Sequence, residues 1–418
     1  MNESIHSNIS DVNLIDTLVA HNDGSTFLPA LQSLHWIQNS FAGETLIKLS
    51  CPSLTMLKME CVSLDEVSTN FLALLPPSFP SLRTLDLGCN LRPFSSTPSL
   101  LRPIIPTFQN LRILRVVDWL NWEDLNSIIS PLEELKFCAA GPDGTNDIRG
   151  ALHAPNLRIL TCYGYFSPMR PIISSLVAPK LEVVTFESTG EYPNHDPLYH
   201  DVTGVLDALI TSQPPVHIRN ITLEFPGVPT DSDLDTELIE HVLYPCLKLP
   251  RLEKLTVWNA AITVVYCSDE GILSLAQSLK HLVHLDLSAS PRASASRSVS
   301  LASLVHLSVH CPHLAFVRLL LGTLLPAAPA ALPALPPPGH SHPLETLDIM
   351  HAPGLSRAVE DPAVVAESAR VLLRLFPTLN IAKSRMESRT WIGDDAVTLP
   401  SDRLWDEVGL VKQQSNSD

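Results

Sequence analysis

Histidine and cysteine residues come closest to forming a chemical site in this sequence. They gather in one stretch of the chain, at His306, His310, Cys311 and His313, and one repeat earlier at His281 and His284. Two histidines four residues apart on one helix are a spacing that zinc sites use. His281 and His313, however, precede the first leucine of a repeated unit, where other units carry Asn, Lys or Arg. The pattern therefore favours an ordinary polar repeat position, and we expect no metal.

Catalytic and nucleotide-binding motifs are missing from the sequence. It has no phosphate-binding G-x-x-x-x-G-K or G-x-G-x-x-G loop, no G-x-S-x-G nucleophile turn and no H-E-x-x-H zinc motif. No acid/base constellation replaces them. We therefore predict that the chain is not an enzyme and takes no cofactor.

Two segments have the composition of loop inserts. Residues 288–303 are rich in serine and carry Arg292 and Arg297, which fits either a phosphorylated loop or a plain flexible one. Residues 326–343 are rich in proline and alanine, which fits either a PxxP docking segment or a disordered insertion. His340-Ser341-His342 lies in the second segment and is expected to be solvated.

A short apolar pattern recurs along most of the chain. The elements that it forms must position the residues considered above. Its form is Leu-x-x-Leu-x-apolar, often after proline, as in PSLRTLDL from Pro80 and PRLEKLTV from Pro250. The spacing of the thirteen units averages about 29 residues, which is typical of a repeat architecture. Their first apolar residues are Leu31, Leu54, Leu82, Leu111, Leu132, Leu157, Leu181, Ile218, Leu252, Leu282, Leu314, Leu344 and Leu379.

Each unit predicts a strand, and the segments between units predict helices. The last two apolar residues of a unit are two apart, so on a strand they face the same way, and stacked strands form a parallel sheet. Between strands the apolar period becomes helical, as in 202–210, 234–243, 272–279 and 365–376. Asp196-Pro197 and Asp361-Pro362 match an N-cap followed by proline. The fold class is therefore an α/β solenoid or horseshoe, with the parallel sheet on the concave face and helices on the convex face.

The period of two also predicts which strand residues point away from the helices. An exposed sheet face of a solenoid is a surface on which a protein partner can dock. We expect the inward Leu85, Leu114, Leu160 and Leu255 to be buried. The outward candidates for protein binding are Asp86, Arg115, Lys136, Tyr163, Glu187, Glu224, Trp258, Asp286, Arg318 and Asp348.

Charge and cysteine usage limit the possible partners and compartments. The net charge is −16, which disfavours binding to nucleic acid or to an anionic membrane. The eight cysteines include no C-x-x-C pair, which indicates buried thiols in a reducing compartment. The first 26 residues lack the features of a signal peptide, so we expect a cytoplasmic or nuclear protein that is not secreted, and a monomer.

The units resemble leucine-rich repeats of the long, irregular kind found in fungal F-box/LRR proteins. The resemblance runs from about Leu28 to Leu379 and continues into the tail at Trp405. It implies that the solenoid captures substrates for a ubiquitin ligase, while an F-box would hold the ligase core. The asparagine that often follows the strand is present at Asn90 but absent from most units, and no F-box is visible. Binding of the ligase core by this chain is therefore not expected, and a structural or remnant F-box/LRR fragment is the alternative reading.

The expected organisation has three parts. Residues 1–26 form a partial repeat, whose helix around Ile15 has lost its own strand. Residues 27–385 form the leucine-rich-repeat solenoid, with loop inserts at 288–303 and 326–343. Residues 386–418 form a C-terminal cap and tail.

Overall fold

The computed structural model describes most of the repeats and several of their connections. The described residues are 4–7, 17, 21, 28–38, 46–47, 51–61, 69–89, 104–120, 122–139, 150–188, 198–212, 217–225, 236–259, 265–288, 299–324, 337, 341–351, 361–389 and 400–415. The chain forms two compact units, unit 1 over Met1–Glu182 and unit 2 over Val183–Asp418.

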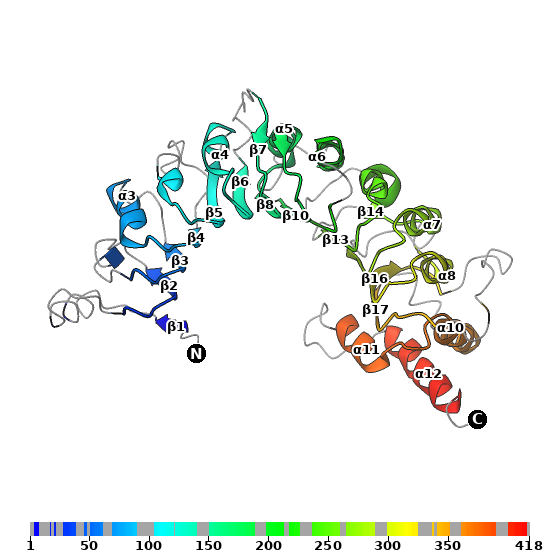
Figure 1. Cartoon of the computed structure of the whole chain (residues 1–418). Coiled ribbons are helices and arrows are strands. Elements are labelled where there is room, and N and C mark those ends of the chain that lie inside the picture. Colours follow the sequence, from blue (N-terminus) through cyan, green and yellow to red (C-terminus); the bar gives the residue numbers. More distant parts are fainter. Residues whose placement is uncertain are drawn as a thin grey trace. The chain divides into compact units, whose positions relative to one another are not determined.

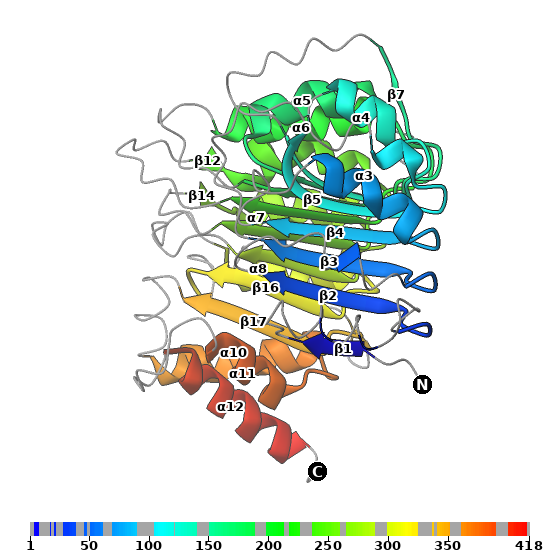
Figure 2. The same ribbon diagram turned by 90° about the vertical axis from the view of Figure 1, so that its left-hand side faces the viewer.

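Unit 1 contains an open parallel sheet whose strands follow the order of the chain. Figure 2 shows β2, β3 and β4 stacked with their arrows pointing the same way. The strands are β1 (Ser4–Ser7), β2 (Ser33–Gln38), β3 (Met56–Cys61), β4 (Thr84–Cys89), β5 (Ile113–Leu120), β6 (Glu134–Ala139) and β8 (Ile159–Tyr163).

The helices of unit 1 lie together on one side of this sheet (Figure 1). A second, two-stranded parallel pair joins β7 (Leu152–His153) to β9 (Leu176–Val177). The helical segments are α3 (Thr69–Ser78), the 3₁₀ turn η2 (Ile105–Thr107), α4 (Trp122–Ile128) and α5 (Phe166–Ser175).

Unit 2 repeats the same plan, with most of its helices along one side of a parallel sheet and the last two at the end of the sheet, beyond its final strand (Figure 1). Its strands are β10 (Val183–Glu187), β11 (Asn220–Phe225), β13 (Lys254–Asn259), β15 (His284–Ser288), β16 (Phe316–Leu321) and β17 (Thr346–His351). A short pair joins β12 (Thr236–Glu237) to β14 (Val265–Tyr266). Its helices are α6 (Leu198–Ser212), α7 (Asp269–Ser278), α8 (Leu301–His310), α10 (Pro362–Leu375), α11 (Ile381–Arg389) and α12 (Pro400–Ser415).

The leucines of each repeat explain why the strands form where they do. The amide of the first leucine closes a turn on the residue three before it, as from Leu82 to Phe79 (3.1 Å) and from Leu282 to Leu279 (3.1 Å). The next two apolar residues then alternate with outward ones along the strand and are buried. Leu85, Leu114, Leu160 and Leu255 are all at most 2% exposed, which confirms the predicted core. In each unit the fold is therefore the predicted α/β leucine-rich-repeat solenoid.

The helix predictions are confirmed in most places. The apolar faces of 202–210, 272–279 and 365–376 fall in α6, α7 and α10. Asp361 caps α10 by accepting a hydrogen bond from the amide of Ala363 (2.9 Å), with Pro362 in the first turn. Asp196-Pro197 lies outside the described residues.

Two expected elements differ in the structure. Residues 234–243 were expected to form an α-helix, but Leu238–Val242 (η3) is a π-helical turn and Tyr244–Lys248 (η4) is a 3₁₀ helix. Pro245 lacks an amide proton and restricts the residue before it, which prevents a regular α-helix here. At the N-terminus, β1 pairs in parallel with β2, so the strand thought to be missing from the first repeat is present. Most of the helix expected around Ile15 lies outside the described residues.

Both inserts are shorter than the sequence predicts. Val299 is buried and forms a bridge with Leu321, while Ser300 caps α8. Asp269, at the start of α7, accepts hydrogen bonds from the Ser300 amide (2.9 Å) and from the hydroxyls of Ser300 (2.6 Å) and Ser303 (2.5 Å). The end of the serine-rich segment is therefore part of the repeat, whereas Arg292 and Arg297 lie outside the described residues.

His342 was expected in solvent but is buried in unit 2. One ring nitrogen, Nε2, is 3.0 Å from the carbonyl of Cys311, and the other, Nδ1, accepts a hydrogen bond from the amide of Leu344 (3.2 Å). These contacts hold the segment just before β17 in place, so the proline-rich insert ends before His342. His340 lies outside the described residues.

Candidate protein-binding face

The strand residues that point away from the helices form rows across each sheet, because neighbouring strands pair in register. In unit 1 the central row runs through His35, Lys58, Asp86, Arg115, Lys136 and Thr161. In unit 2 it runs through Thr185, Thr222, Thr256, Asp286, Arg318 and Asp348. We call this side of each sheet its helix-free face.

All ten predicted residues lie on the helix-free faces. Six of them are in the central rows just given. The other four are two residues further along their strands, which places Tyr163 at the end of β8 and aligns the remaining three in one row, Glu187, Glu224 and Trp258. The period of two therefore located the outward positions correctly, although it could not tell which of them are exposed.

In unit 1 the predicted charges are partnered with each other and with residues that the prediction missed. Arg115 Nε is 2.6 Å from Glu134 Oε1, and its Nη1 is 3.6 Å from Asp86 Oδ2. The hydrogen bond to Glu134 raises the pKa of Arg115. Lys136 Nζ lies 4.4 Å from the centre of the Tyr163 ring, and Tyr163 is only 9% exposed. Glu134 is two residues before Lys136 on β6, so the same period could have identified it.

In unit 2 the three predicted residues Asp286, Arg318 and Asp348 form a covered ion-pair cluster. Arg318 Nη1 is 2.9 Å from Asp286 Oδ2, and Arg318 Nε is 2.5 Å from Asp348 Oδ2. Asp286 is 8% exposed and Asp348 is fully buried. Burial raises the pKa of Asp286 despite the neighbouring guanidinium. These side chains are therefore neutralised inside the protein, and as they stand they offer little to a partner.

An aromatic stack lies beside this cluster. The rings of His284 and Phe316 are parallel, with centroids 4.2 Å apart, and the guanidinium carbon of Arg318 is 5.5 Å from the Phe316 ring. Burial, together with the positive charges of Lys254 and Arg318, lowers the pKa of His284 from 6.5 to about 4. The folded protein therefore holds this imidazole neutral.

That neutral histidine predicts a pH-dependent stability. As the pH falls below 6.5 the unfolded chain binds the proton first, so the free energy of unfolding should decrease between pH 6.5 and about 4. The His284 contribution should reach about 3 kcal/mol across this window, at about 1.4 kcal/mol per pKa unit. Urea unfolding at several pH values should show a shallower decrease for His284→Phe, which keeps a stacked ring without a titrating group. His281→Phe, which removes an exposed imidazole of the same repeat, should follow the unsubstituted chain. Identical pH profiles for His284→Phe and the unsubstituted chain would refute this assignment.

The row formed by Glu187, Glu224 and Trp258 is the most accessible of the predicted residues of unit 2. Trp258 is 37% exposed, and both glutamates are partly exposed. The backbone of the row is tied together, because the amide of Ser188 donates to the carbonyl of Glu224 (2.8 Å). An indole and two carboxylates therefore lie in one row, on strands that are joined by backbone hydrogen bonds.

The histidines considered for a metal include one pair on a helix and one stacked pair. His306 and His310 are on α8, whereas His281 and His313 stack in the turns that precede β15 and β16, with ring centroids 6.2 Å apart. Among the described residues, no three His, Cys, Asp or Glu side chains are grouped closely enough to hold a metal ion. Six described cysteines are buried, and burial raises the pKa of Cys246 and of Cys311 to about 12. The thiols of Cys246 and Cys311 are therefore protonated at neutral pH.

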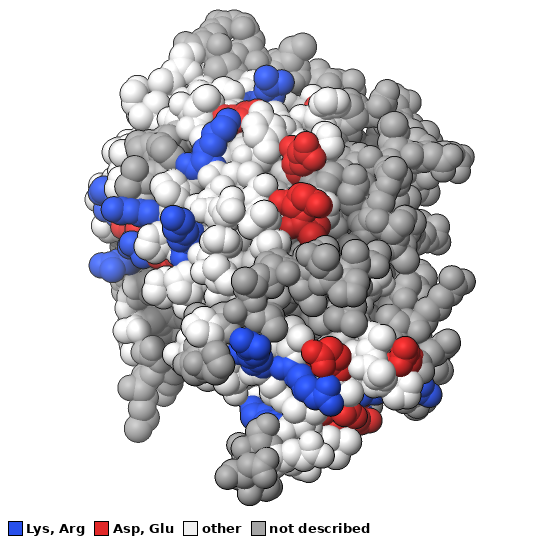
Figure 3. Space-filling view, turned by 90° about the vertical axis from the view of Figure 1, so that its right-hand side faces the viewer, with Lys and Arg blue, Asp and Glu red and all other residues white. Residues whose placement is uncertain are grey.

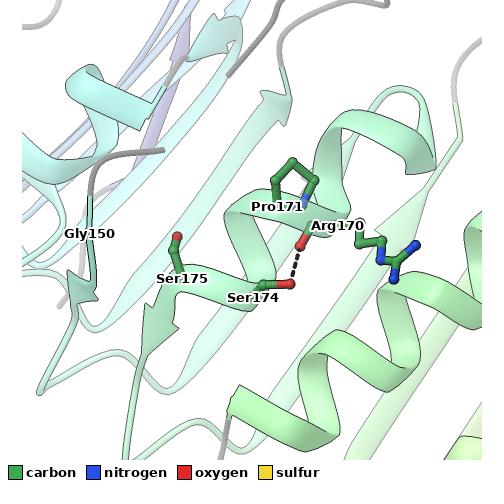
Figure 4. Close-up of a pocket in the computed structure, with 5 residues that line it drawn as sticks. All are labelled: Gly150, Arg170, Pro171, Ser174 and Ser175. Atoms are coloured by element: carbon green, nitrogen blue, oxygen red, sulfur yellow. Dashed lines mark hydrogen bonds between the residues drawn. The ribbon is translucent and has the colours of Figure 1, made fainter. Parts of the chain in front are cut away.

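A hollow on the helix side of unit 1 has none of the features of a ligand site. It has a volume of about 560 Å³ and lies between α5 and the segment before β7, lined by Gly150, Arg170, Pro171, Ser174 and Ser175 (Figure 4). The hydroxyl of Ser174 donates to the Arg170 carbonyl (2.9 Å) rather than into the hollow. The hollow is wide open, and Arg170 is its one charged lining residue.

The charged side chains are dispersed on the described part of the face drawn in Figure 3. In the view of Figure 3, acidic and basic side chains lie in small groups among uncharged atoms, and no extended basic tract is visible on the described part of this face. Among the described residues, no helix is both long enough and apolar enough to cross a membrane.

Comparison with known proteins shows only distant structural likeness. No family model matches the chain, and no curated protein sequence matches it. Similar solved structures include Rad7 in the yeast Rad7–Elc1 complex (12% identity, 81% of this chain and 82% of that chain, TM-score 0.39). Others are the leucine-rich-repeat protein LegL7 of Legionella pneumophila (12% identity, 92% and 100%, TM-score 0.39) and a Bacteroides fragilis protein (17% identity, 64% and 65%, TM-score 0.34). These values are too low to carry an argument about function.

Proposed function

We propose that this protein is a non-catalytic module that binds a protein partner through the helix-free faces of its sheets. The observation that carries the proposal is the set of outward rows, where charged and aromatic side chains stand in fixed register on hydrogen-bonded strands. Such preorganised side chains lose little conformational entropy when a partner docks. The exposed Trp258 is the kind of side chain that supplies much of the energy of an interface.

The chemistry of the described residues favours a protein partner over other ligands. The net charge of −16 opposes a phosphate backbone. The buried, reduced cysteines support a reducing compartment, the cytoplasm or nucleus. From the repeat pattern, we further propose that the module resembles the substrate-recognition part of an F-box/LRR ubiquitin-ligase subunit.

Site-directed photocrosslinking tests the proposed binding face. A benzoylphenylalanine placed at Thr185 or Thr222, on the helix-free face of unit 2, should crosslink to a discrete protein partner in cells that express the chain. The same group at Val309 on α8 or at Leu410 on α12, both exposed but on helices, should not give that product. Denaturing electrophoresis and mass spectrometry would identify the crosslinked species. Equal crosslinking from both sets of positions, or none from the helix-free face, would refute the proposal.

A further inference from the structure

The row of residues at the start of the unit 2 strands, on the helix-free face, contains hydrogen-bond donors and no carboxylate. Asn220 on β11, Lys254 on β13 and His284 on β15 are register partners, and Phe316 on β16 continues the row. All four side chains are half-buried. Neighbouring strands are about 4.8 Å apart, so Asn220 and His284 flank Lys254 closely enough for the three side chains to meet one ligand group.

Lys254 carries a positive charge that pairs with no carboxylate in the described part of the chain. Its neighbour in sequence, Glu253, is already bound by Arg219, whose Nη1 is 3.1 Å from Glu253 Oε1. The arginine of the central row is different, because Arg318 Nη1 is 2.9 Å from Asp286 Oδ2. The row around Lys254 is therefore complementary to a negative charge supplied by another molecule.

The two rings beside Lys254 add no charge to the row. Burial, together with the charges of Lys254 and Arg318, lowers the pKa of His284 to about 4, so at neutral pH the imidazole is neutral and keeps one N–H donor. This ring stacks on that of Phe316, with centroids 4.2 Å apart. The row thus combines one positive charge with an apolar surface, which suits an acidic residue within a protein segment.

A carboxylate on the same face limits the ligand to one acidic group. Glu224 lies four residues after Asn220 on β11, about 13 Å along the strand, and is partly exposed. It disfavours a second negative charge on an extended segment, and it opposes a phosphate, with nearly two charges, more than a carboxylate. A carboxylate accepts hydrogen bonds at both oxygens, and those from an ammonium are charge-assisted.

We propose that Asn220, Lys254 and His284 form a docking site for one aspartate or glutamate side chain of the protein partner. The inference rests on the proposed function, because it names the chemistry by which a partner engages the helix-free face of unit 2. Lys254 binds the carboxylate, and the Asn220 amide and the His284 imidazole donate to its remaining lone pairs. Phe316 supports the apolar part of the segment that carries the acidic residue.

Selection from a displayed library of random eight-residue peptides tests this site on the full chain. We expect a class of peptides that binds the unsubstituted chain but not Lys254→Met, and this class should share an aspartate or glutamate. Fluorescence anisotropy should show that Lys254→Met weakens the affinity of such a peptide by about tenfold, the equivalent of about 1.4 kcal/mol. Lys254→Arg should retain most of the affinity, and Asn220→Ala should weaken it about threefold.

A double-mutant cycle and a matched variant separate a direct contact from general attraction. Replacing the acidic residue of the peptide by its amide should weaken binding to the unsubstituted chain by about tenfold, but binding to Lys254→Met much less, because the two groups contact each other. Lys280→Met removes an exposed lysine of unit 2 outside the row, and should change the affinity less than about twofold.

Far-ultraviolet circular dichroism reports whether each variant is folded. The absence of any Lys254-dependent peptide, equal weakening by Lys254→Met and Lys280→Met, or additive energies in the cycle would overturn the proposal. Crosslinking from Thr185 and Thr222 is read independently, so a partner could still be established if the site for the acidic residue failed.

Discussion

Replacing Arg318 with methionine should lower the free energy of unfolding of unit 2 by about 3–5 kcal/mol. The substitution leaves Asp286 and Asp348 next to each other without the guanidinium that now lies within 2.9 Å of both. A buried charge that loses its partner must bear its full desolvation cost, and this is the main source of the expected loss. The second oxygen of Asp348, Oδ1, has no hydrogen-bond partner that could stabilise the carboxylate once Arg318 is removed. Urea unfolding followed by circular dichroism at pH 7 would measure the change.

Two further variants decide whether the loss of unfolding free energy comes from the carboxylates left without a guanidinium. The triple variant Asp286→Leu/Arg318→Met/Asp348→Leu removes the charges together, and its stability should lie close to that of the unsubstituted chain. Arg370→Met removes an exposed arginine that pairs with Glu367 on α10, and should change stability by less than about 1 kcal/mol. If Arg318→Met were no more destabilising than Arg370→Met, the cluster would contribute nothing to folding.

The features that local patterns could predict are those that depend on near neighbours in the sequence. Leu85 and Leu87 on β4 are two apart, so a strand buries both whatever the rest of the chain does. Asp361 and Pro362 begin α10 through a bond to an amide two residues away. The same local reasoning placed Trp258 and Glu224 on the outward side of their strands.

The features that could not be predicted depend on partners far along the chain. Ser300 looks like any other residue of a serine-rich loop until Asp269, 31 residues earlier, accepts its hydroxyl and amide hydrogens. His342 looks solvated among prolines until the carbonyl of Cys311 reaches its ring. Arg318 looks like an interface arginine until the register places an aspartate on each side of it. Exposure is thus a property of the stacked repeats, whereas orientation is a property of each repeat.

Leu160→Ala should destabilise unit 1 by about 2–5 kcal/mol, because it removes a buried side chain that the surrounding repeats cannot fully replace. Leu160 is 2% exposed on β8, in register with the fully buried Leu135 on β6. Leu74→Ala is the matched control, since Leu74 lies on α3 of the same unit and is 47% exposed. That substitution should change the unfolding free energy by less than about 0.5 kcal/mol. Thermal and urea unfolding of both variants would measure the difference.

The damage from Leu160→Ala should also be local, because a solenoid repeat contacts mainly the repeats beside it. Amide hydrogen exchange should accelerate most in β6 and β8 of the variant, while β2 and β3 at the other end of the unit 1 sheet keep more of their protection. Uniform acceleration across β2 to β8 would instead show that unit 1 unfolds as one cooperative body. If thermal unfolding were unchanged by Leu160→Ala, Leu160 could not occupy the buried side of β8, and the inward and outward assignments on that strand, Tyr163 included, would have to be reversed.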